Sequence, residues 1–559
     1  MAGSTICPEL NRILEHNKNT DYGKKLGFAN IKTVEAYQNA VPLTGYDDYA
    51  PLIELTTRLG EKDIFTALPL AGYTLTSGTT GVPRLIPCTQ THLDGFISQV
   101  RALTGGVRGS TVPLFESMPG KRPYMDGVCL DSISGTVLTG MRKKLKDNAH
   151  ARTFASGAWT SPEAVLFPEE MTDTLHLRVL FALLDKNVEQ IIAPFTWGVL
   201  EAFQYLENNW GLLLEDMEQG SVSRAAAMPE NFRKKLEGSI RKNPKRAEEL
   251  RKIFLQGFDE PVIPKIWPGC RRIIAAGTGS FSIYTEKLRR YSGDITLNNG
   301  LYASSEALIG KAVKDGSDEY LLLPEYGFYE FLPLDEADGK EALTKERLTP
   351  GHSYSLIVTN DSGFYRYRLG DVIRVARFEN DLPVITFEYR SSQTCSLEGE
   401  QLTEKKACQA IHVLQEKTGV DIGDFCVWPD EDRRQYTFLL EPSELSGNME
   451  KMYRTGREEL EQILDEALRG GCEGYREAEE ERGLLPARVL CLQPQTHLLY
   501  RDVERYRRKT APDQIKPVRV LDNPVKEKFF FSMADRKMHG GEELDYYLEN
   551  YRKGIGRKK

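Results

Sequence analysis

The stretch YTLTSGTTGVPRLIP, Tyr73 to Pro87, decides the fold of this chain. Tyr73 to Thr76 is predicted to form a strand, because aromatic and β-branched residues favour a pleated surface. Ser77 to Gly81 is predicted to form a tight loop, since its glycines permit positive φ and close backbone approach. Pro83 and Pro87 disfavour a long helix directly afterwards. The stretch therefore predicts a strand, a glycine-rich loop and a second strand.

A loop of this kind suits a phosphate, because its backbone N–H groups and hydroxyls point into one concavity. It is not a Walker A loop, since the spacing to a Gly-Lys-Ser/Thr ending is absent and no helix N-terminus follows. A surface hairpin with a polar tip is the alternative. The loop by itself leaves both interpretations open, so the decision rests on motifs further along the chain.

Composition sets the class of protein. The chain has 559 residues, of which 40% are hydrophobic and 28% charged, as expected of a soluble globular protein. Its formal net charge of −8 argues against a nucleic-acid binder held by phosphate contacts. A small anionic ligand is still compatible, because a local pocket can be positive in an acidic protein.

The nine cysteines are scattered, and no Cys-x-x-Cys or His-Glu-x-x-His occurs. This spacing favours free thiols in a reducing compartment over a disulfide framework. The N-terminus lacks the basic and apolar segments of a signal peptide, and no apolar run approaches a membrane span. We expect a cytoplasmic protein without a membrane partner.

The middle of the chain carries two further candidate segments. Arg272 to Gly277 is predicted to be a buried strand ending at glycine, where ligand sites of α/β sheets commonly lie. Thr278-Gly279-Ser280 follows, and then a helix from about Ile283 to Tyr291. Ile295 to Glu306, ITLNNGLYASSE, ends in an aromatic ring, two hydroxyls and a carboxylate. That set suits a nucleotide with a metal ion, although an edge strand and its turn is equally compatible.

Phe364 to Val375, FYRYRLGDVIRV, alternates like a strand and is interrupted by Gly370-Asp371. An aspartate held at a tight turn can accept both hydroxyls of a ribose. An ordinary hairpin turn is the alternative, since Gly-Asp is common turn chemistry.

Several helices are predicted from apolar periodicity. Leu175 to Leu184 is one, and Phe195 to Trp210 is another, whose apolar stripe is more typical of a core than of a ligand cage. A helix is also expected to open at Thr91 as its N-cap. On that helix His92 is interpreted as a surface residue and not as a catalytic base.

Three segments together resemble the three signatures of the adenylate-forming superfamily, which includes acyl-CoA synthetases, luciferases and peptide-synthetase adenylation domains. They are Thr76–Arg84, Tyr302–Glu306 and Tyr367–Asp371. The finer resemblance, over about residues 10 to 530, is to the acyl acid amido synthetases first known as auxin-responsive (Gretchen Hagen) proteins of plants. It is carried by Ile266–Pro268, Ser280–Tyr284, Tyr302–Glu306, Phe328–Pro333 and Tyr365–Asp371.

The resemblance implies an α/β fold: a large N-terminal adenylate-forming domain of mixed β-sheets with flanking helices, residues 1–392, and a smaller mobile α+β C-terminal lid, residues 393–559. It also implies ATP and Mg²⁺ as cofactors, with Glu306 as metal ligand. The implied nucleotide-binding residues are Ser77, Gly78, Thr79, Thr80, Thr278, Gly279, Ser280, Tyr302, Ser304, Ser305, Asp371 and Arg390. In these roles the residues of the phosphate loop hold the ATP phosphates, Ser304 and Ser305 lie near the α-phosphate, Tyr302 stacks on adenine and Asp371 holds the ribose. Thr278, Gly279 and Ser280 line the nucleotide or acyl site, and Arg390 contacts ribose or phosphate. Thr79 and Ser305 are also assigned catalytic roles.

The C-terminal part contains predicted helices at Glu404–Glu416 and Met452–Leu468, and strands at Gln435–Leu440 and Ala487–Leu492. The segment Asp513–Arg519, DQIKPVR, resembles the family's Gln-x-Lys-x-Pro-Arg segment with its proline displaced by one. Lys516 is therefore the implied catalytic lysine, which swings onto the acyl carboxylate and α-phosphate. Three other lysines compete for this assignment: Lys509, Lys526 and Lys528.

Two departures from the family concern the phosphate loop. It is one residue shorter than usual in the amido synthetases, and Arg84 stands where a lysine is common. A cation is kept in either case, so the expected function is unaffected, whereas the loop conformation can differ.

The implied reaction has two steps. A carboxylic acid attacks the α-phosphorus of ATP to give acyl-AMP and pyrophosphate, and an amine, expected to be an amino acid, then attacks the acyl-AMP. Two alternatives remain: a thioester-forming ligase that uses CoA, and a nucleotide-binding module without catalysis. The second is disfavoured, because the loop hydroxyls, Glu306, Asp371 and a candidate lysine are all present.

Overall fold

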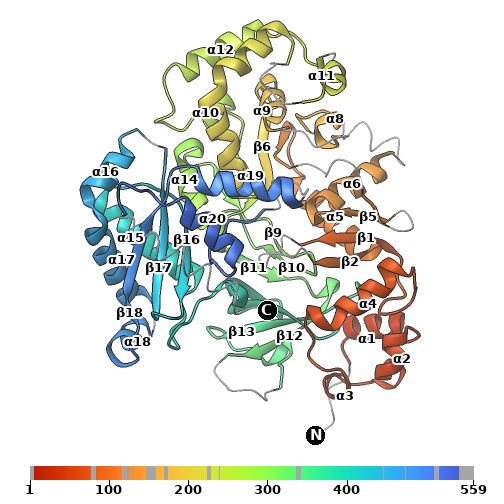
Figure 1. Ribbon diagram of the computed structural model, residues 1–559. Coiled ribbons are helices and arrows are strands. Elements are labelled where there is room, and N and C mark those ends of the chain that lie inside the picture. Colours follow the sequence, from red (N-terminus) through yellow and green to blue (C-terminus); the bar gives the residue numbers. More distant parts are fainter. Residues whose placement is uncertain are drawn as a thin grey trace. The chain divides into compact units, whose positions relative to one another are not determined.

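The computed structural model in Figure 1 describes residues 6–76, 84–115, 122–124, 128–146, 159–168, 174–222, 228–237, 239–334, 341–444, 446–472, 474–508 and 515–539. Its contacts divide the chain into two compact units. Of the described residues, those up to Phe387 form the first unit and those from Glu388 onward form the second. The two units are described separately below. The boundary expected after residue 392 stays a prediction.

The phosphate-loop stretch lies in a four-stranded sheet of order β2-β1-β5-β4. Strand β1 (Leu70–Leu75) pairs antiparallel with β2 (Leu85–Thr89), Leu75 opposite Leu85, and parallel with β5 (Val128–Asp131); β4 (Arg122–Tyr124) completes the sheet. The two strands predicted around the loop are thus confirmed. The loop itself, Ser77 to Pro83, lies outside the described residues.

A second sheet of the first unit is parallel throughout, with the order β3-β6-β7-β8. Its strands are β3 (Ser110–Pro113), β6 (Val188–Phe195), β7 (Arg272–Ala276) and β8 (Thr296–Asn298). Three long helices belong to its connections: α9 (Leu175–Leu184), α10 (Thr196–Gln219) and α14 (Ser282–Ser292). The predicted strand, helices and apolar stripe are confirmed, since Trp197, Leu200, Phe203 and Leu206 are buried.

The other helices of the first unit flank these sheets. Figure 1 shows α12 (Pro244–Phe254) beside α10, with α11 (Glu230–Glu237) near them. Four helices precede the first sheet: α1 (Pro8–Asn17), α2 (Asp21–Leu26), α3 (Val34–Ala40) and α4 (Tyr46–Arg58). Three more are α6 (Ile133–Lys146), α8 (Glu163–Leu166) and α13 (Ile263–Ile266).

The third sheet has seven strands in the order β12-β13-β14-β15-β11-β10-β9. They are β12 (Phe328–Pro333), β13 (Ser353–Thr359), β14 (Tyr367–Glu379), β15 (Leu382–Arg390), β11 (Glu319–Leu322), β10 (Leu308–Ala312) and β9 (Leu301–Ala303). The interruption expected at Gly370-Asp371 is wrong, because β14 runs through both residues. A register shift opposite Ser355–Ile357 and a φ of 85° at Gly370 absorb the irregularity without a turn.

Helix α5 (Gln90–Thr104) follows β2 directly, and two predictions about it are wrong. Its N-cap is Thr89 and not Thr91, since the Thr89 hydroxyl accepts a hydrogen bond from the His92 N–H at 3.3 Å. His92 is only 5% exposed and so is not a surface residue. The reason is packing, because α5 lies against β1, β2, β10 and α6.

The second unit is an α+β domain around the sheet β16-β17-β18. Its strands are β16 (Ile422–Asp430), β17 (Gln435–Pro442) and β18 (Leu485–Cys491). Its helices are α15 (Glu404–Thr418), α16 (Asn448–Thr455), α17 (Arg457–Gly471), α18 (Tyr475–Glu481), α19 (Thr496–Arg508) and α20 (Pro524–Ser532). The single helix expected over Met452–Leu468 is wrong, because Gly456, with a φ of 75°, separates two helices. Among the described residues, no helix is long and apolar enough to cross a membrane.

Candidate active site

The base of the phosphate loop is closed by two hydrogen bonds between Thr76 and Arg84. The Thr76 N–H donates to the Arg84 carbonyl at 3.0 Å, and the Arg84 N–H donates to the Thr76 hydroxyl at 3.1 Å. The two ends of the loop are therefore fixed in an antiparallel hairpin. Four predicted nucleotide-binding residues, Ser77, Gly78, Thr79 and Thr80, lie outside the described residues.

Tyr46 contacts the exit of this loop. The Arg84 guanidinium carbon lies 4.9 Å from the centroid of the Tyr46 ring, a cation–π contact. The Tyr46 hydroxyl accepts a hydrogen bond from the Leu85 N–H at 3.1 Å. Burial raises the pKa of Tyr46, while the positive charge of Arg84 lowers it. Tyr46 therefore holds the backbone and the guanidinium at the loop exit.

The segment Ser304–Glu306 forms a compact turn between β9 and β10. The Ser304 hydroxyl accepts hydrogen bonds from the N–H groups of Glu306 and Ala307, both at 3.2 Å. A hydroxyl has two acceptor lone pairs and one donor, so its hydrogen stays available to donate to a phosphate oxygen. Ser305 and Glu306 are half-buried. The turn therefore presents a hydroxyl and a carboxylate at a partly open surface.

The residues present fit Mg²⁺ held jointly with phosphates. Among the described residues, no group of three or more His, Cys, Asp or Glu side chains could hold a metal ion. Mg²⁺ is usually bound through one or two carboxylates together with substrate phosphates, and not in an all-protein cage. A single half-buried carboxylate such as Glu306 suits that mode of binding.

A hydrogen bond joins the second and third predicted segments. The Tyr302 hydroxyl donates to Asp371 Oδ2 at 2.9 Å, which fixes the orientation of the carboxylate. The Tyr302 ring packs on Tyr320 and Phe387, with centroid distances of 5.6 and 5.9 Å. Tyr302 is 8% exposed and Asp371 1% exposed. The structure brings these two residues together, while their roles toward adenine and ribose stay predictions.

Thr278-Gly279-Ser280 leads from the end of β7 into a short 3₁₀ helix, Gly279–Phe281. Gly279 has a φ of 59°, and a Cβ there would lie 3.0 Å from the Phe387 ring, so both conformation and space favour glycine. Thr278 is hydrogen-bonded to Tyr320, whose pKa burial raises to about 12. This segment thus lies beside the aromatic cluster of Tyr302, Tyr320 and Phe387, here called the Tyr302 cluster, as expected of a nucleotide or acyl site.

Sequence reasoning missed the side chains that support the third segment. Arg366 has a φ of 47°, in the left-handed region, which is uncommon for a side chain of this size. Its guanidinium lies 3.1 Å from Glu330, which is fully buried, and donates to the carbonyls of Gln38 and Val41 at 2.8 and 2.9 Å. The detectable signal was a carboxylate inside the apolar strand Phe328–Pro333.

Tyr365 is held equally firmly by the N-terminal segment. Its hydroxyl donates to the Phe65 carbonyl at 2.7 Å, and its N–H donates to the Tyr49 hydroxyl at 2.7 Å. Its ring belongs to a buried cluster with Leu10, Ile13 and Tyr37 from α1 and α3. The N-terminal helices therefore brace the start of the strand that carries Asp371.

In the second unit, Lys516 lies in a short extended segment anchored by Arg519. The Arg519 guanidinium contacts Glu404 at 2.8 Å and Asp424 at 2.5 Å, and is buried. The Val427 N–H also donates to the Arg519 carbonyl at 2.8 Å, which attaches the segment to β16. Lys516 itself is half-buried.

Of the three lysines that compete with Lys516, Lys526 and Lys528 lie among the described residues. Lys526 is buried and ion-paired with Asp522 at 2.7 Å, which makes it a poor candidate for a lysine that must reach a substrate. Lys528 is exposed on α20, and Lys509 lies outside the described residues. Arg390 is half-buried at the last position of β15.

Comparison with solved structures identifies the class of fold. A structure described as 2-hydroxyisobutyryl-CoA ligase in the postadenylation state has a TM-score of 0.54 at 12% identity, covering 98% of this chain and 91% of that chain. One described as GH3.15 acyl acid amido synthetase has a TM-score of 0.79 at 23% identity, covering 94% and 92%. The fold is that of the adenylate-forming enzymes.

Family models narrow this class. The chain belongs to the GH3 family, because the GH3 family N-terminal domain matches residues 9–297, the central domain residues 320–390 and the C-terminal domain residues 405–525. A similar protein of Oryza sativa subsp. japonica, a jasmonoyl–L-amino acid synthetase (GH3.5), is 28% identical over 428 residues, covering 72% of this chain and 73% of the relative. The family and fold predicted from the sequence are thus confirmed.

Proposed function

We propose that the chain is an ATP-dependent acyl acid amido synthetase. It converts a carboxylic acid to acyl-AMP with release of pyrophosphate, and then transfers the acyl group to the amine of an amino acid. The name of the 28%-identical relative, a jasmonoyl–L-amino acid synthetase, supports an amino acid as acceptor. The observation that carries the proposal is the hydrogen bond from Tyr302 to Asp371, which joins two of the three predicted segments in one unit.

For the first step, the chain supplies positioning and charge. The phosphate-loop residues Ser77, Gly78, Thr79 and Thr80 bind the phosphates of ATP, and the Arg84 guanidinium at the loop exit adds positive charge. Ser304 and Ser305 donate hydroxyl hydrogens near the α-phosphate. Glu306 holds Mg²⁺, which when bound neutralises negative charge on the phosphates. Because the carboxylate is itself the nucleophile, no side chain has to form a covalent intermediate.

The nucleoside end of ATP is held by the Tyr302 cluster. Tyr302 stacks on adenine, Asp371 accepts hydrogen bonds from the ribose, and Thr278, Gly279 and Ser280 line the adjacent wall. The existing bond from Tyr302 to Asp371 supports this assignment, because it orients the carboxylate before a nucleotide arrives. A pre-oriented group loses less entropy on binding.

For the second step, we propose that residues 393–559 act as a mobile lid that carries Lys516. Arg390, which precedes the lid, contacts ribose or phosphate. Lys516 pairs with the acyl carboxylate and α-phosphate while acyl-AMP forms. The anchoring of its segment by Arg519 on β16 supports this, since a lysine delivered by a moving domain needs a rigid base. The lid then reorients and admits the amine.

The acceptor is the part of the proposal that an experiment can decide directly. ATP–pyrophosphate exchange across a panel of carboxylic acids identifies an accepted acid. That acid is then supplied with ATP, Mg²⁺ and either amino acids or CoA. Amide and AMP without thioester support the proposal, whereas thioester without amide from any amine makes the protein a CoA ligase.

A further inference from the structure

Asn360 is hydrogen-bonded to the turn that carries Glu306. The Asn360 side-chain amide donates to the Glu306 carbonyl at 2.6 Å, and Asn360 is only 1% exposed. Asn360 lies at the end of β13, just before the strand that carries Asp371. Since the Ser304 hydroxyl accepts from the Glu306 N–H, both peptide groups that flank the Glu306 side chain are hydrogen-bonded.

A second side chain near this turn is His92 of α5, which is buried close to the backbone of Ser305, the residue before Glu306. Burial lowers the pKa of His92 to about 4, so the ring is neutral at physiological pH.

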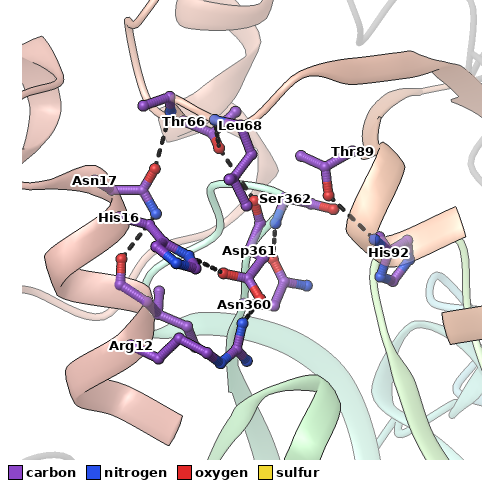
Figure 2. A network of polar contacts seen from close by, with 12 residues as sticks. Arg12, His16, Asn17, Thr66, Leu68, Thr89, His92, Asn360, Asp361 and Ser362 are labelled. Carbon is purple, nitrogen blue, oxygen red and sulfur yellow. Dashed lines mark hydrogen bonds and ion pairs between the residues drawn. The ribbon is translucent and has the colours of Figure 1, made fainter. Parts of the chain in front are cut away.

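The turn that bears Asn360 is held by a network of polar contacts, which Figure 2 shows. The Ser362 N–H donates to Asn360 Oδ1 at 3.0 Å, and the Asn360 N–H donates to the Phe364 carbonyl at 2.9 Å. Asp361 is ion-paired with Arg12, and its carbonyl accepts from the Thr66 hydroxyl at 3.1 Å. Asn360 is therefore fixed independently of Glu306 and can act as its support.

We infer that Asn360 is a positioning residue for Glu306. The inference rests on the proposed role of Glu306 as a Mg²⁺ ligand. Asn360 fixes the carbonyl of Glu306 and the Ser304 hydroxyl fixes its N–H, so together they set the point from which the carboxylate reaches the ion. A displacement of about 1 Å at a reacting centre can cost about a hundredfold in rate.

The test compares Asn360→Asp with the parent protein. The aspartate keeps an oxygen for the Ser362 N–H but places a second oxygen opposite the Glu306 carbonyl. The hydrogen bond is thereby replaced by repulsion between two oxygen atoms. Two quantities are measured: Mn²⁺ binding to the complex with α,β-methylene-ATP, by electron paramagnetic resonance, and ATP–pyrophosphate exchange. We expect Mn²⁺ affinity to fall about tenfold and exchange to fall about tenfold to a hundredfold.

Two further variants separate positioning from folding. Asn360→Ser keeps a side-chain oxygen within the turn but is too short to reach Glu306, so it should reproduce the loss of Mn²⁺ affinity. Asn448→Asp is the matched control, because Asn448 is 3% exposed and donates to the Asp421 carbonyl at 2.7 Å in the second unit. It should leave both Mn²⁺ affinity and exchange within about twofold of the parent.

A further variant, Glu306→Gln, tests separately whether Glu306 binds the metal ion, which is the role on which the inference about Asn360 rests. If Glu306→Gln weakens Mn²⁺ binding while Asn360→Asp and Asn360→Ser bind Mn²⁺ like the parent, Asn360 does not position Glu306. If Glu306→Gln itself leaves Mn²⁺ affinity unchanged, Glu306 is not a metal ligand and the inference about Asn360 falls with it. Weaker Mn²⁺ binding in all three variants, with the control unaffected, supports it.

Discussion

Replacing Arg366 by methionine should destabilise the first unit, because Arg366 forms a buried ion pair that supports the third predicted segment. Glu330 has no exposed surface, and its carboxylate is paired with Arg366 at 3.1 Å. Breaking a buried pair by removing one partner costs about 3–5 kcal/mol, because the remaining charge is left uncompensated. Arg366→Met should therefore lower the free energy of unfolding of the first unit by about that amount at pH 8.

The loss of stability in Arg366→Met should become larger as pH rises. Burial already raises the pKa of Glu330 above its ordinary value, and Arg366 opposes that increase. Without Arg366 the folded pKa rises further, so the folded protein keeps a proton that the unfolded chain releases. Stability then falls as pH rises from the unfolded towards the folded pKa, by about 1.4 kcal/mol per pH unit. The variant should accordingly be closest to the parent at low pH.

The assay is urea unfolding followed by tryptophan fluorescence at several pH values. Trp197 and Trp267 are buried in the first unit and report on it. The control is the double variant Glu330→Gln, Arg366→Met, in which no charge is left unpaired, so most of the loss and its pH dependence should disappear. A loss below about 1 kcal/mol at every pH, or one that the double variant does not relieve, would refute the reasoning.

Three other predictions concern single side chains. Glu306→Gln keeps the volume but removes the charge that pairs with Mg²⁺, so ATP–pyrophosphate exchange should fall by orders of magnitude with the unfolding midpoint unchanged; near-normal exchange would exclude the role. Lys516→Ala should abolish exchange yet still convert supplied acyl-AMP to amide, and the same behaviour in Lys526→Ala instead would reassign the lysine. Burial and the charge of Asp465 raise the pKa of Glu479 to about 7, from 4.5, so stability of the second unit should fall as pH rises between these values. Glu479→Gln should flatten that fall in thermal unfolding of the full chain, and an unchanged pH profile would count against it.

The sequence predicted elements whose local pattern and packing agree. The strands on either side of the phosphate loop and the helix Leu175–Leu184 were found because propensity and periodicity act locally. His92 was misassigned because its burial depends on what α5 packs against. The helix expected over Met452–Leu468 was wrong because Gly456 permits a backbone conformation that ends one helix and starts another.

The motifs of the candidate site could be predicted from the sequence, whereas the side-chain pairs that hold these motifs in place could not. Tyr302 and Asp371 were each identified from sequence, and the structure joins them by a hydrogen bond. Arg12 and Asp361, one of the pairs that support these motifs, are 349 positions apart. No local pattern can reveal such a pair, because each partner looks like an ordinary surface charge until the fold brings them together.

Product analysis with an accepted acid distinguishes amide synthesis through an acyl-adenylate from thioester formation. The protein is incubated with ATP, Mg²⁺ and that acid, with amino acids in one series and CoA in the other, and the products are identified by mass spectrometry. We expect an acyl–amino acid amide together with AMP, and no thioester. Rapid thioester formation, with no amide from any amino acid or amine, would contradict it.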